Sequence, residues 1–343
     1  MTTLRPDLMR GATRLTQAGR RVEATAVLVD TPEAKAGPGE FTGGTHTHAA
    51  QSLRYKLFVP QGHGLRPLPL VVMLHGCTQD ADDFAAGTGM NERARERAFF
   101  VLYPQQASHA NPSACWNWFK HNHQQRGRGE PALIASLTQA VMQHYGVDPG
   151  RVYLAGLSAG GAMAAIVAAA YPELFAAVGV HSGLPGGAAS NLAEALAVMQ
   201  GGANLQFKAA LSGNAAEVAV HARKRVPTIV FHGDQDRTVH PRNGEQIIAA
   251  ALEQFAGTPL GPARTGPDQR RVERGVSAQG RHYTRHIHND HNGRATAEHW
   301  LVHGAGHAWS GGQPQGSCTE ADGPDATREM LRFFFAQAHP ACH

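Results

Sequence analysis

The chain has 343 residues, of which 42% are hydrophobic and 17% are charged. A chain of this length and apolar content can bury a large core, and one α/β domain of roughly 290 residues is the simplest arrangement. The formal net charge is +4 at pH 7, a small and diffuse excess. A nucleic-acid-binding protein would carry a focused basic stripe with interleaved aromatic residues, so the composition argues against a nucleic-acid partner.

The N-terminal region differs in composition from the rest of the chain. Its apolar residues are interrupted repeatedly by arginines, so neither a signal peptide nor a membrane span fits, and we expect a cytoplasmic protein. Residues 9–27 have helical apolar spacing and are expected to form an arm that packs on the domain or makes a homodimer contact. Residues 31–48 are rich in Gly, Pro and Thr, which is typical of a linker. We therefore divide the chain into an arm and linker, 1–48, and a globular domain, 49–343.

Short apolar runs alternate with helical patterns in the globular domain. The runs expected to form strands are 68–74, 99–103, 151–155, 176–180, 226–231 and 300–302. Residues 131–145 and 159–170 have the composition of helices. This alternation predicts a mostly parallel sheet with helices on both faces and a ligand site at the carboxyl ends of the strands. Residues 185–225 have little strand character and are expected to form a small cap beside that site.

The segment Gly156-Leu157-Ser158-Ala159-Gly160 joins a predicted strand to a predicted helix. This is the context in which G-x-S-x-G presents a nucleophilic serine. The turn strains the serine backbone, so its neighbours must be small, and the helix start supplies free N–H groups beside the serine oxygen. We therefore predict that Ser158 is a nucleophile; the alternative is a glycine-rich packing turn.

A nucleophilic serine needs a base and an orienting carboxylate, which follow it in the order acid, then histidine. The strand at 226–231 leads to Asp234 and Asp236. We favour Asp236, because a residue further past the strand end can reach across to the histidine, and we expect Asp234 to brace the turn. The last predicted strand leads to His303 and His307. We favour His307, because His303 lies nearer the strand, where a structural role is expected.

The tetrahedral intermediate of such a reaction needs backbone N–H donors that are already in place. Ala159, directly after the serine, is expected to supply one donor. The second is expected from Cys77 in the turn that follows the strand at 68–74. The alternative is that this turn has no electrostatic role.

Three alternating histidines, His282, His286 and His288, precede the turn sequence at 289–293. Their spacing is compatible with a metal site. A hairpin with the strand that follows explains them without metal, as half-exposed strand residues, and we favour that interpretation.

Five stretches together resemble a known family: LHGCTQ at 74–79, CWNWF at 115–119, GLSAGGAM at 156–163, HGDQD at 232–236 and GAGHAWSGG at 304–312. They are similar to the esterase family of poly(3-hydroxybutyrate) depolymerases, whose catalytic domain is similar to carbohydrate esterases that cleave feruloyl or acetyl groups from xylan. The resemblance runs from about residue 52 to the C-terminus. It implies an α/β-hydrolase fold with the catalytic domain over 49–343.

The resemblance also implies roles for particular residues. The triad would be Ser158, Asp236 and His307, with Cys77 and Ala159 as oxyanion donors. Three tryptophans would line or border the substrate cleft: Trp116, Trp118 and Trp309. The cysteine pairing that matches the resemblance is Cys77–Cys115 with Cys318–Cys342. Free thiols are the alternative, because a reducing cytosol argues against stable bridges, and bridges would instead point to a secreted or periplasmic protein.

We therefore expect a serine ester hydrolase that works through an acyl-enzyme and needs no cofactor or metal. The resemblance favours a 3-hydroxyalkanoate polyester or its oligomers as substrate, because the small, alanine-rich segment after 182–185 is similar to the depolymerase branch. A feruloyl or acetyl carbohydrate esterase is the alternative. The third hypothesis, a non-catalytic binding protein with the hydrolase fold, conflicts with the complete set of serine, acid and histidine.

Overall fold

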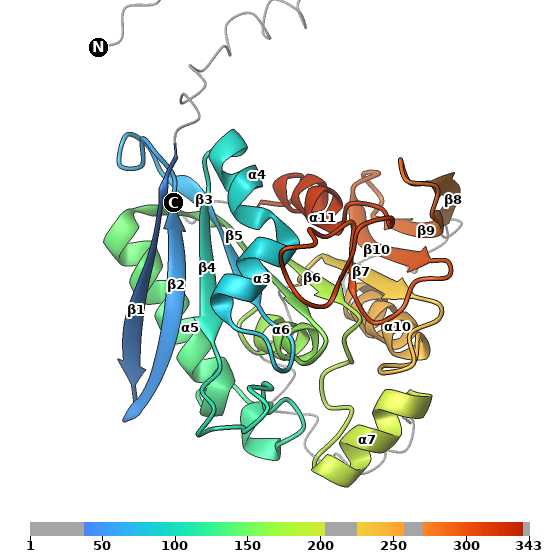
Figure 1. Cartoon of the computed structure of the whole chain (residues 1–343), viewed down its shortest axis with the longest axis horizontal. Helices are drawn as coiled ribbons and strands as arrows, with labels where there is room; N and C mark the ends of the chain where they lie inside the picture. Colours follow the sequence, from blue (N-terminus) through green and yellow to red (C-terminus); the bar gives the residue numbers. More distant parts are fainter. Residues whose placement is uncertain (1–37, 203–224, 257–269, 339–343) are drawn as a thin grey trace, which may run out of the picture. The chain divides into compact units, whose positions relative to one another are not determined.

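The computed structural model describes residues 38–202, 225–256 and 270–338, so the predicted arm at 9–27 lies outside the described residues. The described chain forms a ten-stranded sheet in the order β1-β2-β4-β3-β5-β6-β7-β10-β9-β8 (Figure 1). The strands are β1 (Glu40–His48), β2 (Gln51–Val59), β3 (Leu68–Leu74), β4 (Phe100–Gln105), β5 (Val147–Leu157), β6 (Ala177–His181), β7 (Thr228–Gly233), β8 (Arg270–Val276), β9 (His282–Asn289) and β10 (Ala295–Val302).

The centre of the sheet is parallel. Strands β4, β3, β5, β6, β7 and β10 run in the same direction, whereas β1–β2 on one side and β9–β8 on the other are antiparallel. Every residue of β3, β6 and β7 is buried, which is why these strands appear in the sequence as continuous apolar runs rather than alternating patterns. The predicted hairpin is confirmed, since β9 pairs antiparallel with β10.

Helices cover both faces of the sheet, as the alternation predicted. One face packs against α3 (Ala81–Thr88), α4 (Met90–Arg97) and α11 (Ala326–Phe335), and the other against α5 (Gly129–Tyr145), α6 (Ala159–Ala170) and α10 (Arg242–Ala256). The remaining described elements are the 3₁₀ turn η1 (His121–His123), α7 (Leu192–Gly201) and the short paired strands β11 (Trp309–Ser310) and β12 (Thr319–Glu320). Among the described residues, no helix is both long and apolar enough to span a membrane.

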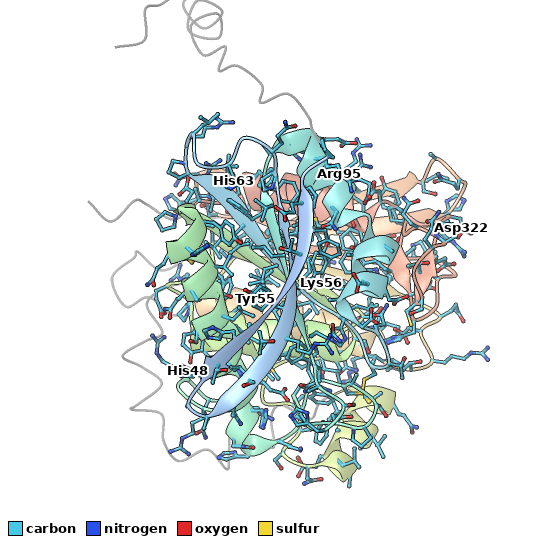
Figure 2. The ribbon with its side chains drawn as sticks, turned by 60° about the vertical axis from the view of Figure 1, so that its left-hand side comes forward. His48, Tyr55, Lys56, His63, Arg95 and Asp322 are labelled. Carbon is cyan, nitrogen blue, oxygen red and sulfur yellow. A yellow bond between two sulfur atoms is a disulfide. The ribbon has the colours of Figure 1, made fainter. Side chains whose placement is uncertain are left out.

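The predicted linker at 31–48 is wrong over its second part, because Glu40–His48 forms β1 and pairs along its whole length with β2. Figure 2 shows this hairpin from the side, with His48 at its turn and Tyr55 and Lys56 on β2. The glycines that suggested a linker have a packing role: a Cβ on Gly44 would lie 2.5 Å from the Tyr55 ring. Glycine content alone therefore did not distinguish a linker from an edge strand over which an aromatic ring lies.

The predicted cap at 185–225 contains α7, and residues 203–224 lie outside the described residues. Asn191 caps the start of α7 by accepting a hydrogen bond from the Glu194 N–H. The Asn243 side chain donates to the Val198 carbonyl at 3.0 Å, which ties the end of α7 to the start of α10. The cap as a whole stays a prediction.

Candidate active site

Ser158 lies at a sharp turn between β5 and α6 at the carboxyl edge of the parallel strands. Its φ of 57° and ψ of −120° belong to a region that residues with a side chain rarely adopt. The Ser158 N–H donates to the His181 carbonyl at 2.9 Å, which holds the strained residue against the end of β6. Backbone strain of this kind is concentrated at functional sites.

The small residues around Ser158 are required by close backbone contacts. A Cβ on Gly156 would lie 2.3 Å from the Gly160 oxygen, and one on Gly160 would lie 2.1 Å from the Leu74 oxygen. Larger residues would therefore push α6 away from the ends of β3 and β5. The glycines of the motif allow the helix start to approach both strands.

Asp236 and His307 meet in the loops that follow β7 and β10. The distance from His307 Nδ1 to Asp236 Oδ2 is 2.7 Å, and the Asp236 side chain is buried. The other oxygen, Oδ1, accepts the N–H groups of Thr238 at 2.9 Å and Val239 at 2.8 Å. A carboxylate held on both oxygens has one orientation, which fixes the imidazole that it binds.

The electrostatic environment keeps Asp236 ionised. Burial alone would raise the pKa of this carboxyl group. Hydrogen bonds from His232, His307 and the Val239 amide, with the charge of His307, outweigh burial and hold the pKa well below its usual range. Asp236 is therefore a carboxylate at neutral pH and can stabilise an imidazolium at His307.

Asp234 makes a separate pair with His303. Its Oδ2 lies 2.9 Å from His303 Nδ1, and its Oδ1 accepts the Gly304 N–H at 2.7 Å. The second ring nitrogen of His303 lies 2.9 Å from Thr284 Oγ1. Asp234 and His303 thus fasten the loop that carries His307 and do not take part in the Asp236–His307 contact.

His181, which we did not identify from the sequence, connects the serine loop to the histidine loop. Its carbonyl accepts the Ser158 N–H, and its Nε2 accepts the Ser310 N–H at 3.0 Å, three residues beyond His307. Burial, and then the charges of His232 and His307, lower the pKa of His181 to about 3, so its ring is a neutral acceptor. The signal in the sequence was a polar residue at the end of a fully apolar run.

The predicted oxyanion donors belong to two anchored turns. Ala159 is the first residue of α6, so its N–H has no acceptor within the helix. Around Cys77, the Gly76 N–H donates to Gln79 Oε1 at 2.9 Å, and the Thr78 N–H donates to the Ser113 carbonyl at 2.7 Å. These contacts on both sides of Cys77 fix the plane of its amide.

A disulfide joins Cys77 to Cys115, as the resemblance implied, and links the turn after β3 to the loop after β4. The second pairing needs correction: Cys318 is exposed and its thiol is free, and Cys342 lies outside the described residues. Stable disulfides are typical of oxidising compartments, so the expected cytoplasmic location is not supported.

The buried carboxylate of Glu130, also missed in the sequence, fixes the loop that contains Cys115. It accepts hydrogen bonds from the Gln106 side chain at 2.6 Å and from the Asn117 backbone N–H at 2.8 Å. The Asn117 side chain donates to it as well, at 2.6 Å. Through the disulfide, this network also restrains Cys77.

The tryptophans pack in the core beside the site, and their place along a substrate cleft stays a prediction. Trp116, Trp118 and Trp309 are all buried. The Trp116 indole N–H donates to the His75 carbonyl at 3.1 Å, and that of Trp309 donates to Thr327 Oγ1 at 3.0 Å. Trp309 also stacks on His181, with ring centroids 5.1 Å apart. Aromatic residues beside a catalytic motif can belong to the core below it, which the sequence does not reveal.

Comparisons with known proteins agree with this arrangement. The family described as Esterase PHB depolymerase matches residues 53–271. Poly(3-hydroxyalkanoate) depolymerase C from Paucimonas lemoignei is 36% identical over 188 residues, which cover 54% of this chain and 44% of that protein. Acetylxylan esterase A from Talaromyces purpureogenus is 29% identical over 218 residues, covering 61% of this chain and 55% of that protein. The chain thus spans about half the length of these curated relatives.

A solved structure, the acetyl xylan esterase from Aspergillus awamori, superposes with a TM-score of 0.63 at 20% sequence identity. The match covers 86% of this chain and 99% of that chain. With the mostly parallel sheet and its two helical layers, this likeness shows the α/β-hydrolase fold that was predicted.

Proposed function

The chain belongs to the PHB depolymerase family of esterases, and from this premise we propose that it is a serine carboxylic-ester hydrolase. The observation that carries the proposal is the buried Asp236 carboxylate, bonded to His307 at 2.7 Å, in the same set of loops as the strained Ser158. An acid, a base and a nucleophilic hydroxyl are the three groups that acyl transfer through a serine requires.

The proposed reaction has two halves. In the first, Ser158 Oγ attacks the ester carbonyl while His307 Nε2 takes the hydroxyl proton. This nitrogen is the one available to the serine because Nδ1 is bonded to Asp236. When the ester C–O bond breaks, His307 returns the proton to the departing alcohol and Ser158 is acylated. In the second half, a water molecule loses a proton to His307 and attacks the acyl carbon. The bond from that carbon to Ser158 Oγ then breaks, His307 returns the proton to Oγ, and the carboxylic acid is released.

The amides of Cys77 and Ala159 would stabilise the negative charge on the carbonyl oxygen in both halves. Ala159 begins α6, where the unpaired N–H groups and the helix dipole favour a negative charge. The Cys77 amide lies in a turn fixed by the Gln79 side chain, the Ser113 carbonyl and the disulfide. Donors held in place before the reaction starts need no reorganisation as charge develops.

The substrate that we propose is a 3-hydroxyalkanoate polyester or its oligomers. The support is the 36% identical poly(3-hydroxyalkanoate) depolymerase C. In addition, α7 presents two exposed leucines one helical turn apart, Leu192 at 60% and Leu196 at 54% exposure, on an element bonded to the segment after Asp236. An apolar surface suits a polyester chain better than a sugar.

The second candidate is a carbohydrate esterase that removes acetyl or feruloyl groups. Its support is the similarity to Acetylxylan esterase A and to Feruloyl esterase B from Thermothelomyces thermophilus, which is 28% identical over 203 residues, 57% of this chain and 68% of that protein. Both candidates use the same proposed triad and differ in the group that the cleft binds.

Parallel assays separate the two candidates. Release of 3-hydroxybutyrate from amorphous polymer is compared with release of acetate and ferulate from substituted xylo-oligosaccharides, with the Ser158→Ala variant as the blank. Preferential release of 3-hydroxybutyrate supports the polyester substrate. Preferential release of acetate or ferulate contradicts it and supports the second candidate. If the Ser158→Ala variant is as active as the wild type, the serine mechanism itself is wrong.

A further inference from the structure

Two histidines behind Asp236 each have a buried nitrogen without a hydrogen-bond partner among the described residues: His232 Nδ1 and His299 Nε2. His232 is the second-last residue of β7 and is fully buried, and His299 lies on β10 with an exposed fraction of 7%. Buried polar atoms are nearly always paired in native proteins. Two such atoms in one place therefore require an explanation.

The hydrogen bonds of His232 determine which of its nitrogens carries the proton. Nε2 lies 2.8 Å from the Val239 carbonyl and 3.4 Å from Asp236 Oδ2, and both of these groups are acceptors. Nε2 therefore carries a proton, and in the neutral tautomer Nδ1 has a lone pair that can accept a hydrogen bond. This tautomer also places the Nε2 proton of His232 beside the carboxylate that binds His307.

Both unpartnered nitrogens face the same small space beside Gly244 on α10. A Cβ at this glycine would lie 2.9 Å from His232 Nδ1 and 3.2 Å from His299 Nε2. The two nitrogens therefore lie close to the same position beside Gly244. Glycine keeps that space free of a side chain and lets α10 approach the sheet closely.

The charges around this space favour a neutral occupant. Burial, followed by the neighbouring His232, His286 and His288, lowers the pKa of His299 to about 3, so its ring is neutral near pH 7. A cation would need more donor ligands than two imidazoles, and among the described residues no group of three His, Cys, Asp or Glu residues is placed to hold one. A water molecule can donate to His232 Nδ1 and also bond His299 Nε2.

We propose that one internal water molecule binds between His232 and His299 beside Gly244, and that this water and His232 position Asp236 for catalysis. The water fixes the His232 ring, whose Nε2 lies 3.4 Å from Asp236 Oδ2, and Asp236 in turn orients His307. His232 and His299 are positioning residues, because neither contacts the substrate. The inference rests on the proposed function, since it assigns a purpose to the hydrogen bonds of Asp236.

A high-resolution crystal structure of the full-length protein tests the water site without any measurement of activity. The expected result is one ordered water within hydrogen-bond distance of both His232 Nδ1 and His299 Nε2. A direct bond between the two rings, or a space between them with no electron density, overturns the proposal. If the water is present and the Ser158→Ala variant still hydrolyses esters, the proposed function fails while the water site stands.

The Gly244→Ala variant tests the effect on catalysis, because its methyl group would lie 2.9 Å from His232 Nδ1 and 3.2 Å from His299 Nε2 and would crowd out a water between them. We expect kcat for a short-chain chromogenic ester to fall about 10- to 100-fold with KM nearly unchanged. The melting temperature should also fall, although alanine is the better helix former. The matched control is Gly201→Ala on α7, where a Cβ meets nothing within 4 Å, and kcat should not change. An unchanged kcat in Gly244→Ala overturns the proposal.

Two variants of His299 keep the test decisive if Gly244→Ala does not fold. His299→Gln places a polar group near the position of Nε2, so this variant should retain the water and most of the wild-type kcat. His299→Leu removes the proposed hydrogen bond to the water, and kcat should fall about tenfold or more while KM stays nearly constant. Equal loss in both variants indicates a packing role only and contradicts the proposal.

Discussion

The loops after β7 and β10 hold two aspartate–histidine pairs of nearly the same length, 2.9 Å for Asp234–His303 and 2.7 Å for Asp236–His307. Their surroundings differ. The side chains of the first pair are 29% and 39% exposed, whereas those of the second are 0% and 16% exposed, in the same order. In the first pair, Thr284 Oγ1 also forms a hydrogen bond with Nε2 of His303. An Asp–His contact alone therefore does not identify a catalytic dyad, because two such pairs in neighbouring loops differ in burial and in the further contacts of the histidine.

The largest expected effect comes from the two histidines. His307→Ala should lower kcat/KM for a chromogenic ester by about 10⁴-fold or more, because the proposed base is lost. His303→Ala should lower it by less than about tenfold, because only a brace of the loop is lost. Steady-state kinetics of both folded variants gives the comparison. Similar losses in the two variants would mean that the pairs do not have different roles.

The aspartates should show the same difference with a smaller loss. Asp236→Asn should lower kcat by about 10³- to 10⁴-fold, because the amide favours the wrong tautomer of His307. Asp234→Asn should keep kcat within about tenfold of the wild type, because Asp234 bonds His303 and the Gly304 N–H rather than His307. Circular dichroism verifies that both variants are folded. An Asp234→Asn variant as inactive as Asp236→Asn would reverse the assignment.

The stability of the wild type and that of the Asp236→Asn variant should depend differently on pH. The pKa of Asp236 is held below its unfolded value of about 3.9, so ionised Asp236 stabilises the fold above that pH and the stabilisation is lost as pH falls toward the folded pKa. We expect the difference in melting temperature between the wild type and Asp236→Asn to be largest above about pH 4 and to shrink below it. A difference in melting temperature that stays constant between about pH 2.5 and 7 would contradict this expectation.

The smallest effect is expected at Thr284. Thr284→Val removes the hydroxyl that bonds His303 and should destabilise the fold by about 1 kcal/mol. Because the His307 pair is untouched, kcat should stay within about twofold of the wild type. Thermal unfolding and kinetics measure both quantities. A large fall in kcat would contradict this expectation and would mean that the Asp234–His303 pair also affects catalysis.

Much of this arrangement was predictable from the sequence, because buried parallel strands and the serine turn leave local signals. The run at 68–74 forms β3 with the same bounds, and the helix at 159–170 is α6. The preference for Asp236 over Asp234 followed from the distance past the strand end, and the structure places Asp236 against His307.

The residues that the sequence did not reveal depend on contacts between distant segments. His181 and His232 look like ordinary strand ends, and they become relevant only when β6 and β7 lie side by side. Trp309 belongs to the core because Phe84 and His181 pack on its ring, which no local pattern indicates. The second part of the predicted linker likewise forms a strand only because it pairs with β2, a contact that its composition does not indicate.

We propose that Ser158 becomes acylated because His307 and Asp236 activate it. Rapid quenching of the enzyme with a chromogenic ester, followed by peptide mass spectrometry, tests this most directly. We predict the acyl group on the Ser158 peptide of the wild type and its loss in His307→Ala. An acyl group on a different residue, or turnover by Ser158→Ala at the wild-type rate, would contradict it.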